Sequence, residues 1–195
     1  TGSIASGKTT ASKIISYKKG PLFSADKIVK KLYSQSSFKK LVGKKFNLTL
    51  DKNFKKNLKI KILNKELNLK KLEKLIHPLV RREMYNFQKK NKHKKLLFFE
   101  IPLLIESKLK KHFNVVLFIK SKKNLRLKRY VSRGGNVKLF KLLNNYQIKD
   151  SKKAKFCNHI CVNNGSLAVL KKDLLNIIKL YEWDFSRYRN NWPFV

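Results

Sequence analysis

The chain has 195 residues, the size of one domain, and is long enough to bury a sizeable hydrophobic core. Its formal net charge at pH 7 is +37, from 48 basic and 11 acidic residues. No run of about 18 apolar residues is present to span a membrane, and no secretory signal is recognisable, so we expect a cytoplasmic protein without membrane contact.

The distribution of the positive charge argues against a dedicated nucleic-acid surface. Seven of the 48 basic residues are arginines, and the lysines are scattered along the whole chain beside abundant Asn, Ile and Phe. Such a composition is typical of AT-rich codon usage, and solvated surface lysines explain it. We therefore expect nucleic acid to bind only nonspecifically, at low salt.

The chain opens with TGSIASGKTT, which fits the phosphate-loop pattern G-x-x-x-x-G-K-[ST]. In this pattern the glycines let backbone N–H groups turn toward an anion, the lysine reaches the β- and γ-phosphates, and the hydroxyl binds Mg²⁺. The pattern also arises by chance, so it needs a strand before it and a helix after it. The candidate ATP-binding residues here are Gly2, Ser3, Ile4, Ala5, Ser6, Gly7, Lys8, Thr9 and Thr10.

The required helix is expected from Lys8 to Lys19, where Ala11, Ile14 and Ile15 are spaced as on one helix face and Gly20 can end the helix. The required strand would lie before Thr1. We therefore expect that a short apolar first strand is missing from the sequence.

The remaining elements predict an α/β fold interrupted by a helical block. Apolar runs at 95–100 and 114–120 are typical of parallel strands that are buried on both faces. Shorter strands are expected at 21–26 and 160–163, a helix at 166–182, and helices throughout 27–92. We expect a parallel sheet flanked by helices, with a helical insert.

Two carboxylates follow strands of this sheet. Asp26 comes after the second strand and Glu100 ends the third, so both should lie with the phosphate loop at the carboxyl edge, where ligands bind. Either could bind Mg²⁺ or accept a proton. The alternatives are that Asp26 caps a helix beginning at Lys27 and that Glu100 is structural.

Three arginines and one histidine also stand out. Arg126, Arg129 and Arg133 share one helix face, and their planar groups suit phosphate oxygens, although solvated side chains are an alternative that we favour for Arg126. Gly134 and Gly135 follow and could form a lid hinge. A lone histidine such as His77 is more often structural, with the next proline restarting a helix.

Together these motifs resemble the dephospho-CoA kinase family over nearly the whole chain. The marks occur in the family's order: TGSIASGKTT, SAD at 24–26, LIHPLVRRE, EIPLLIES, an arginine-bearing helix followed by Gln147, and VNNG. EIPLLIES and IHPLV are the most discriminating, because many kinases share the phosphate loop.

The resemblance implies a P-loop kinase fold and transfer of the γ-phosphoryl group of ATP to the 3′-hydroxyl of dephospho-CoA. The products are CoA and ADP, and the reaction is the last step of coenzyme A biosynthesis, with Mg²⁺ as cofactor. The implied organisation is one domain, 1–195, with a core of about 1–26 and 94–195. A helical acceptor-binding insert spans about 27–93 and a helical lid about 124–150. We expect a monomer whose partners are ATP and dephospho-CoA.

The resemblance also implies residue roles. Asp26 would accept or orient the hydroxyl proton, and it is the motif's sole carboxylate because Ser24 stands where the family commonly has an acid. The remaining roles are catalysis by Lys8 and Arg133, ATP binding by Arg129 and Arg133, acceptor binding by Asp26, His77, Pro102 and Leu103, and metal binding by Thr9 and Glu100.

Three alternatives remain open on the residues alone. A P-loop kinase acting on a nucleoside monophosphate or another small molecule would share the loop, the insert and the lid. A basic nucleic-acid-binding protein would explain the charge, and its best local support is the tail WDFSRYRNNWPFV at 183–195. An inactive relative is disfavoured by the intact Lys8, Thr9 and Asp26.

Overall fold

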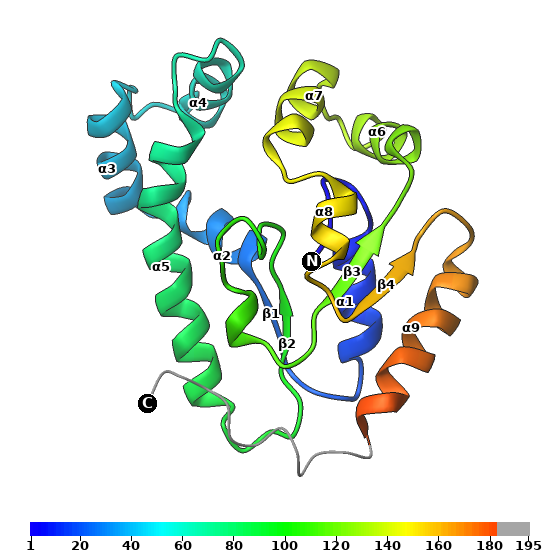
Figure 1. Ribbon diagram of the computed structural model, residues 1–195. Helices are drawn as coiled ribbons and strands as arrows, with labels where there is room; N and C mark the ends of the chain where they lie inside the picture. The colour runs from blue at the N-terminus through cyan, green and yellow to red at the C-terminus, as the bar shows by residue number, and fades with distance from the viewer. Residues whose placement is uncertain (183–195) are drawn as a thin grey trace. The chain divides into compact units, whose positions relative to one another are not determined.

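Short strands alternate with helices in two stretches of the chain, and an all-helical stretch lies between them (Figure 1). The computed structural model describes residues 1–182, so the tail at 183–195 lies outside the described residues. By their internal contacts the residues form two compact units. We call residues 1–23 together with residues 93–182 the core unit, and residues 24–92 the helical unit.

The core unit holds the strands and the helices that cover them. The strands are β1 (Leu22–Ser24), β2 (Phe98–Glu100), β3 (Leu117–Lys120) and β4 (His159–Val162). The last residue of β1, Ser24, is also the first residue of the helical unit. The helices are α1 (Lys8–Ser16), α6 (Lys123–Val131), α7 (Val137–Tyr146), α8 (Asp150–Ala154) and α9 (Leu167–Glu182), with a short 3₁₀ helix, η1 (Lys110–His112).

Strand β3 pairs on both of its edges. Its partner on one edge is β4, which runs parallel with Phe118 opposite Ile160. On the other edge Gly2 forms a parallel bridge with Ile119, and the Ile119 N–H donates to the Thr1 carbonyl at 2.9 Å. The residues that open the phosphate loop are thus fixed beside β3 by backbone hydrogen bonds.

The strands are shorter than the apolar runs predict. Strand β1 pairs with β2 and β3 with β4, so the described strands form two two-stranded sheets instead of the expected continuous one. The Phe98 N–H donates to the Pro21 carbonyl at 3.0 Å, and the Thr1 hydroxyl reaches the Pro102 carbonyl just after β2 at 3.0 Å. The α/β architecture with parallel strands flanked by helices is confirmed.

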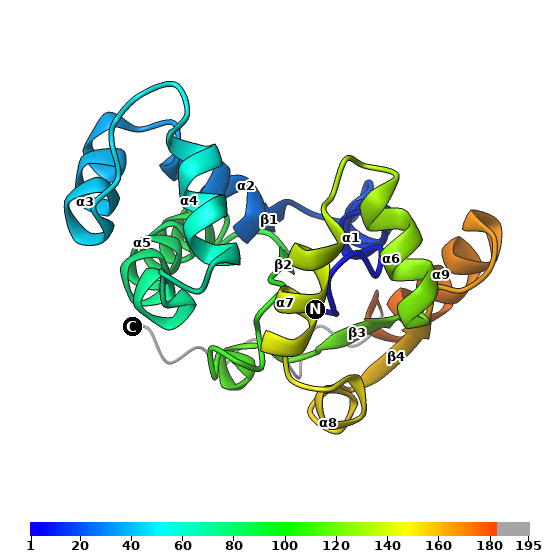
Figure 2. The same cartoon turned by 90° about the horizontal axis from the view of Figure 1, so that it is seen from above.

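Helices α1 and α9 pack on β3 and β4 and bury a small apolar core (Figure 1). The helix-spaced residues of α1 face this core, as the sequence predicts. Helix α8 contacts β3 from the side away from α1 (Figure 2). The core consists of Ala11, Ile119, Cys161, Leu170 and Leu174, with Ile14, Ile15, Leu117 and Ile177 packed against it.

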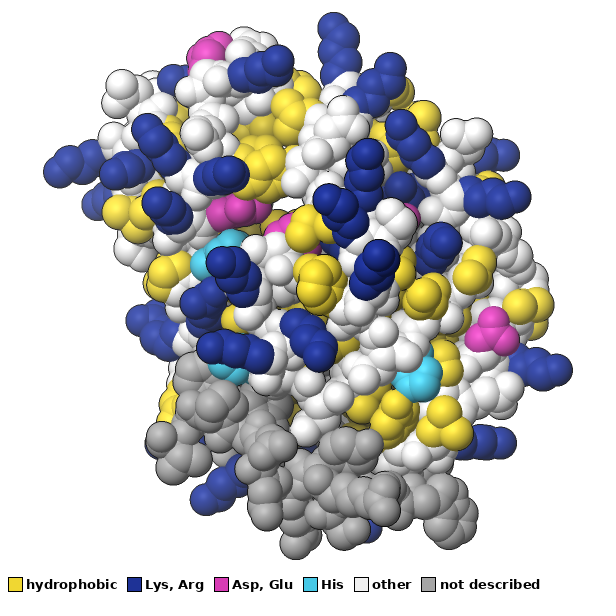
Figure 3. Space-filling model, in the orientation of Figure 1, with side chains coloured by type: hydrophobic (Ala, Val, Ile, Leu, Met, Phe, Trp, Pro, Cys, Tyr) yellow, Lys and Arg dark blue, Asp and Glu magenta, His cyan; other side chains and the backbone are white. Residues whose placement is uncertain are grey.

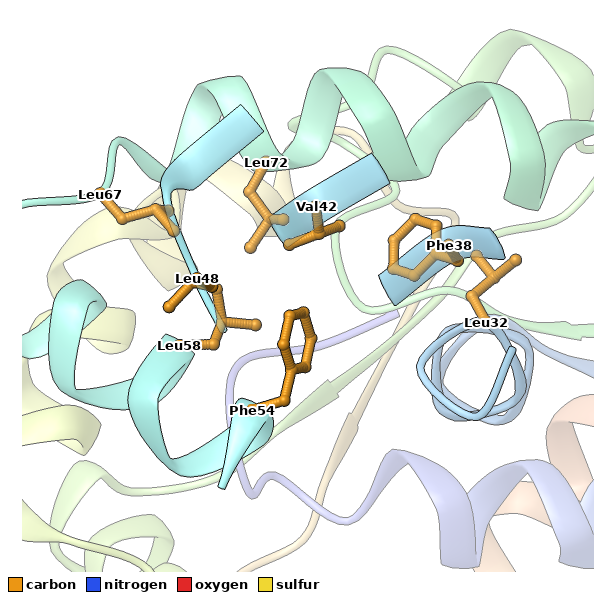
Figure 4. Close-up of a cluster of buried hydrophobic side chains, with 8 residues drawn as sticks. All are labelled: Leu32, Phe38, Val42, Leu48, Phe54, Leu58, Leu67 and Leu72. Carbon is orange, nitrogen blue, oxygen red and sulfur yellow. The ribbon is translucent and has the colours of Figure 1, made fainter. Parts of the chain in front are cut away.

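The helical unit has its own apolar core. It comprises α2 (Ala25–Leu32), α3 (Ser36–Phe46), α4 (Phe54–Leu63) and α5 (Leu69–Lys90). Side chains from all four helices meet in one cluster, where Val42 is fully buried and Phe54 is 2% exposed (Figure 4). The cluster consists of Leu32, Phe38, Val42, Leu48, Phe54, Leu58, Leu67 and Leu72.

Helix α5 corrects the prediction that Pro78 restarts a helix. The helix is continuous from Leu69 to Lys90, with Pro78 inside it. Proline removes one backbone hydrogen bond and usually breaks a helix. Here Leu75, Ile76, Leu79 and Val80, on both sides of the proline, pack against the unit's core and hold the helix together.

The described part of the face drawn in Figure 3 is strongly basic. Lys and Arg side chains are scattered over this part of the face and form no single stripe on it. Within residues 1–182, no helix combines the length and the apolar character needed to cross a membrane.

Candidate active site

The phosphate loop is shaped by its two glycines. Gly2 lies so close to β3 that an added Cβ would stand 2.6 Å from the Ile119 carbonyl oxygen. Gly7 has φ +99°, in the left-handed region, and an added Cβ there would lie 2.2 Å from Nδ2 of Asn163. A turn between them is closed by the Ser6 N–H, which donates to the Ser3 carbonyl at 3.1 Å. Only glycine fits the conformation and the space at position 7.

Helix α1 starts directly from this loop. Gly7 is its N-cap, and the first hydrogen bond of the helix runs from the Ala11 N–H to the Gly7 carbonyl at 3.0 Å. The preceding N–H groups, at Lys8 to Thr10, therefore have no acceptor one turn earlier within the helix. No acidic side chain lies in the first turn of α1. This helix end is suited to an anion such as a phosphate.

Lys8 and Thr9 place a cation and a hydroxyl at the same helix end. The Lys8 ammonium donates to the Ser3 carbonyl at 2.8 Å, so its charge lies across the loop. The Thr9 hydroxyl donates to Oε1 of Glu100 at 2.5 Å, and Glu100 is 3% exposed at the end of β2. The predicted meeting of Glu100 with the loop is confirmed.

The Thr9 and Glu100 oxygens fit a hard divalent cation such as Mg²⁺, which binds oxygen ligands and keeps several for phosphate and water. No group of three or more His, Cys, Asp or Glu among residues 1–182 could hold a metal ion.

Polar side chains from the α6–α8 region contact the opening of the loop. The Ile4 N–H donates to Oε1 of Gln147 at 2.9 Å, and the Ser3 hydroxyl donates to Asp150. Arg126 donates to the Ile4 carbonyl at 3.3 Å. Asn163, at the end of β4, donates to the Ser6 carbonyl at 2.8 Å. Sequence reasoning assigned Gln147, Asp150 and Asn163 no role, although Gln147 and the VNNG motif marked their segments.

The arginines differ from the predicted set. Arg126 is 5% exposed, so the expectation of a solvated side chain is wrong. Burial lowers the pKa of its guanidinium, and nearby Asp150 opposes that shift. Arg129 donates to the Ser121 hydroxyl at 3.1 Å. Arg133 lies beyond the C-cap of α6 and does not share the helix with the other two.

A hollow of about 800 Å³ lies beside the loop. Its wall includes the basic segment after β3, the end of α7 and the start of α8. It is large enough for a nucleoside, and its lining combines lysines with side-chain amides. The lining residues are Ser3, Lys120 to Lys123, Arg126, Asn144, Asn145, Gln147 to Asp150, Val162 and Asn164.

Asp26 and His77 belong to the helical unit. Helix α2 begins at Ala25 with Ser24 at the N-cap position, so the alternative in which Asp26 caps a helix from Lys27 is wrong. Asp26 is exposed in the first turn, where the helix dipole favours an acid. His77 is half-buried in α5; burial lowers its pKa, against the opposing effect of Glu73 and with that of Arg81.

Pro102 and Leu103 lie in the core unit, in the turn after β2. The Pro102 carbonyl accepts the Thr1 hydroxyl, and the Leu103 carbonyl accepts the Ser107 hydroxyl at 2.6 Å. The Pro102 backbone thus connects the EIPLLIES segment to the residue that opens the phosphate loop, whereas the Leu103 contact lies within that segment.

Known proteins resemble this chain over most of its length. The family model described as dephospho-CoA kinase matches residues 1–169. A dephospho-CoA kinase of Rickettsia typhi is 32% identical over 191 residues, covering 93% of this chain and 95% of its own. One from Fusobacterium nucleatum is 33% identical over 180 residues, covering 88% and 91%.

Solved structures agree. A Thermus thermophilus protein superposes with a TM-score of 0.74 at 22% identity, covering 92% of this chain and 94% of its own, and so supports the fold. A dephospho-CoA kinase from Campylobacter jejuni superposes with a TM-score of 0.55 at 29% identity and the same coverage. With the matching family model and the two relatives above 30% identity, these likenesses establish that the chain belongs to the dephospho-CoA kinase family.

Proposed function

We propose that this protein transfers the γ-phosphoryl group of ATP to the 3′-hydroxyl of dephospho-CoA, giving CoA and ADP. The observation that carries the proposal is the loop from Gly2 to Thr9, with the Thr9–Glu100 contact beside it, in a chain of the dephospho-CoA kinase family. The loop, Lys8 and Glu100 lie together in the core unit, and groups of these kinds bind and neutralise phosphates in phosphoryl-transfer enzymes.

The phosphates of ATP would bind at the N-terminus of α1, where the backbone N–H groups and Lys8 can neutralise their charge. Lys8 would exchange its Ser3 carbonyl acceptor for phosphate oxygens. The nucleoside would occupy the hollow beside the loop, whose lysines and amides can bind ribose and base edges. Catalysis in this scheme comes mainly from positioning and electrostatic stabilisation.

Thr9 and Glu100 are the residues that would hold Mg²⁺. A bound Mg²⁺ would neutralise charge that develops on the phosphate oxygens. Arg129 and Arg133 would add cationic groups from a lid of about residues 124–150. Arg133 already lies outside a regular helix, between α6 and α7, where a lid could move its side chain.

The acceptor would bind through the helical insert, about residues 27–93, with His77 contacting dephospho-CoA. Pro102 and Leu103 would contribute from the core unit. Asp26 would accept or orient the proton of the ribose hydroxyl, which is too weakly acidic to ionise before attack. Its first-turn, exposed location in α2 leaves the carboxylate accessible for that role.

The decisive experiment measures ADP release from ATP–Mg²⁺ with dephospho-CoA and with a panel of nucleoside monophosphates and pantothenate-derived acceptors. We expect turnover with dephospho-CoA alone. Turnover confined to another acceptor would keep the kinase chemistry and reject the proposed substrate. A folded protein that releases no ADP with any of these acceptors would reject the proposal altogether.

A second test is the variant Lys8→Ala, which removes the cation of the phosphate loop. Its ammonium donates to the Ser3 carbonyl within the loop and its side chain is only half-buried, so folding should survive. We expect turnover to fall by about a hundredfold or more, the usual effect of deleting a group that stabilises transition-state charge. Wild-type turnover in this variant would contradict the assignment of the loop.

A further inference from the structure

Arg126 connects the phosphate loop to several other segments of the core unit. Its guanidinium donates to three acceptors from three segments: the Ser121 carbonyl after β3 at 3.1 Å, the Ile4 carbonyl at 3.3 Å and Oδ1 of Asn144 in α7 at 2.8 Å. Its Cζ atom also lies 5.9 Å from the centroid of the Phe140 ring, which is fully buried. One buried cation thus joins the loop to the helices that follow β3.

Asp150 completes this cluster from the start of α8. One of its oxygens accepts the Ser3 hydroxyl, and the other lies 3.9 Å from the Arg126 guanidinium. Ser3 and Ile4 are adjacent in the loop, so the pair contacts two consecutive residues: Arg126 binds the carbonyl of one and Asp150 the hydroxyl of the other.

The segment that carries Asp150 is itself anchored. The Ile148 N–H donates to Oε1 of Glu106 at 3.1 Å, and the same oxygen lies 2.7 Å from the ammonium of fully buried Lys153. Gln147, in the same segment, accepts the Ile4 N–H. An ion pair with a fully buried ammonium therefore fixes the backbone from which Gln147 and Asp150 contact the loop.

From these contacts we propose that Arg126 and Asp150 are positioning residues for nucleotide binding, acting as a charge-paired clasp on Ser3 and Ile4. The clasp holds Ser3 and Ile4 of the phosphate loop in place and links them to α7 and α8. It rests on the proposed function, since ATP is taken as the loop's ligand.

The balance of charge between Arg126 and Asp150 predicts a distinctive pattern of ADP affinities in single and double variants. Asp150 is an anion beside a site for anionic phosphates, and Arg126 offsets its charge. Removing Arg126 alone should both release Ile4 and leave an unbalanced carboxylate, which repels phosphate. Removing the Asp150 charge as well should then recover part of the affinity, whereas a purely structural loss would not be reversed.

The test is calorimetric titration of ADP–Mg²⁺ into the whole chain and into Arg126→Met, Asp150→Asn and the double variant. We expect Arg126→Met to weaken ADP binding about tenfold, the scale of lost hydrogen bonds to a charged group. We expect the double variant to bind ADP several-fold more tightly than Arg126→Met. The KM for dephospho-CoA should stay within about twofold of the wild type.

Lys128→Met is the matched control, because Lys128 lies on the same helix with an exposed side chain and the same charge. It should leave ADP affinity unchanged. Thermal unfolding of each variant reports whether it folds; if Arg126→Met does not, Arg126→Gln replaces it in the same cycle, since glutamine also removes the charge but keeps a side-chain amide that can donate a hydrogen bond.

Two results would overturn the clasp. One is unchanged ADP affinity in the Arg126 variant, and the other is a double variant that binds no better than the Arg126 variant alone. A wild type that binds ADP but does not phosphorylate dephospho-CoA would reject the proposed function and leave the clasp testable by the same titrations.

Discussion

Gly7 is the residue on which the shape of the phosphate loop most depends. It combines a left-handed backbone with an immediate neighbour, Asn163, whose amide binds the Ser6 carbonyl. Any side chain at Gly7 would have to displace this amide and accept the backbone strain, which costs on the order of 1–3 kcal/mol by itself. Both effects act on the loop and not on the apolar cores.

Gly7→Ala should therefore abolish most ADP binding while lowering the thermal unfolding midpoint. Calorimetric titration of ADP and a thermal melt measure the two effects. Adding Asn163→Ala should relieve the collision and recover some stability, without restoring the wild type because the strain remains. Gly165→Ala, where an added Cβ meets nothing within 4 Å, is the control. Normal ADP affinity in Gly7→Ala would show that the loop does not need this geometry.

Asp26 is the residue whose proposed role rests most on the family. Asp26→Asn keeps the size and removes the proton acceptor, so we expect turnover to fall about a hundredfold or more while ADP affinity stays within about twofold. Removing the negative charge of Asp26 from the first turn of α2 should lower the free energy of unfolding by at most about 1 kcal/mol. Steady-state kinetics and a thermal melt separate these effects.

Glu66→Gln makes the same chemical change at another exposed carboxylate of the helical unit and should leave turnover unchanged. Near-normal turnover in Asp26→Asn would show that Asp26 is not the proton acceptor and only stabilises the N-terminus of α2 through the helix dipole.

At the scale of elements, the sequence predicted what depends on local pattern. The helix after the phosphate loop follows from the spacing of Ala11, Ile14 and Ile15, and its burial against α9 confirms it. The strands are located correctly, but β2 and β3 are each three residues shorter than their apolar runs. Apolar residues outside a strand can be buried by packing as well, so hydrophobicity alone does not mark where pairing ends.

Long-range contacts were not predictable in the same way. The Thr9–Glu100 contact was predictable, because the phosphate loop and Glu100 were each expected at the carboxyl end of a parallel strand. These ends lie at the same edge of a sheet. The burial of Arg126 was not, because its acceptors come from segments far apart in the chain, and no spacing within α6 indicates them. The continuity of α5 through Pro78 likewise depends on tertiary packing around the proline.

Helix α5 gives a prediction about pH through His77. Burial lowers the pKa of His77 below its ordinary value of 6.5, so just below pH 6.5 the unfolded chain binds a proton that the folded chain does not. The His77 contribution to the free energy of unfolding should therefore rise with pH through this window and level off above it.

We expect His77→Gln to gain stability relative to the wild type as the pH falls from about 7 to about 5, because Gln has no proton to bind. Thermal melts of both proteins across this range measure the difference, in which the titration of all other groups cancels. A difference that is independent of pH would contradict the effect of burial. A raised KM for dephospho-CoA in the same variant would support the proposed acceptor contact.

At the scale of the whole molecule, the net charge of +37 must act on any anionic ligand. The basic side chains are spread over the visible face and do not converge on one stripe (Figure 3). A distributed field of this kind raises the local concentration of polyanions and is screened by salt over about 10 Å at 0.1 M. It therefore favours ATP without selecting it.

We expect the KM for ATP to rise several-fold when salt is raised from about 50 mM to about 500 mM, with little change in kcat, because screening weakens attraction before binding and not the contacts inside the loop. Steady-state kinetics at fixed Mg²⁺ measure it. A single exposed substitution such as Lys59→Gln should leave the KM unchanged, since each distant lysine adds little to the field. A strong effect of that one variant would instead indicate a localised anion site on α4, and a salt-independent KM would mean that the excess charge does not contribute to ATP binding.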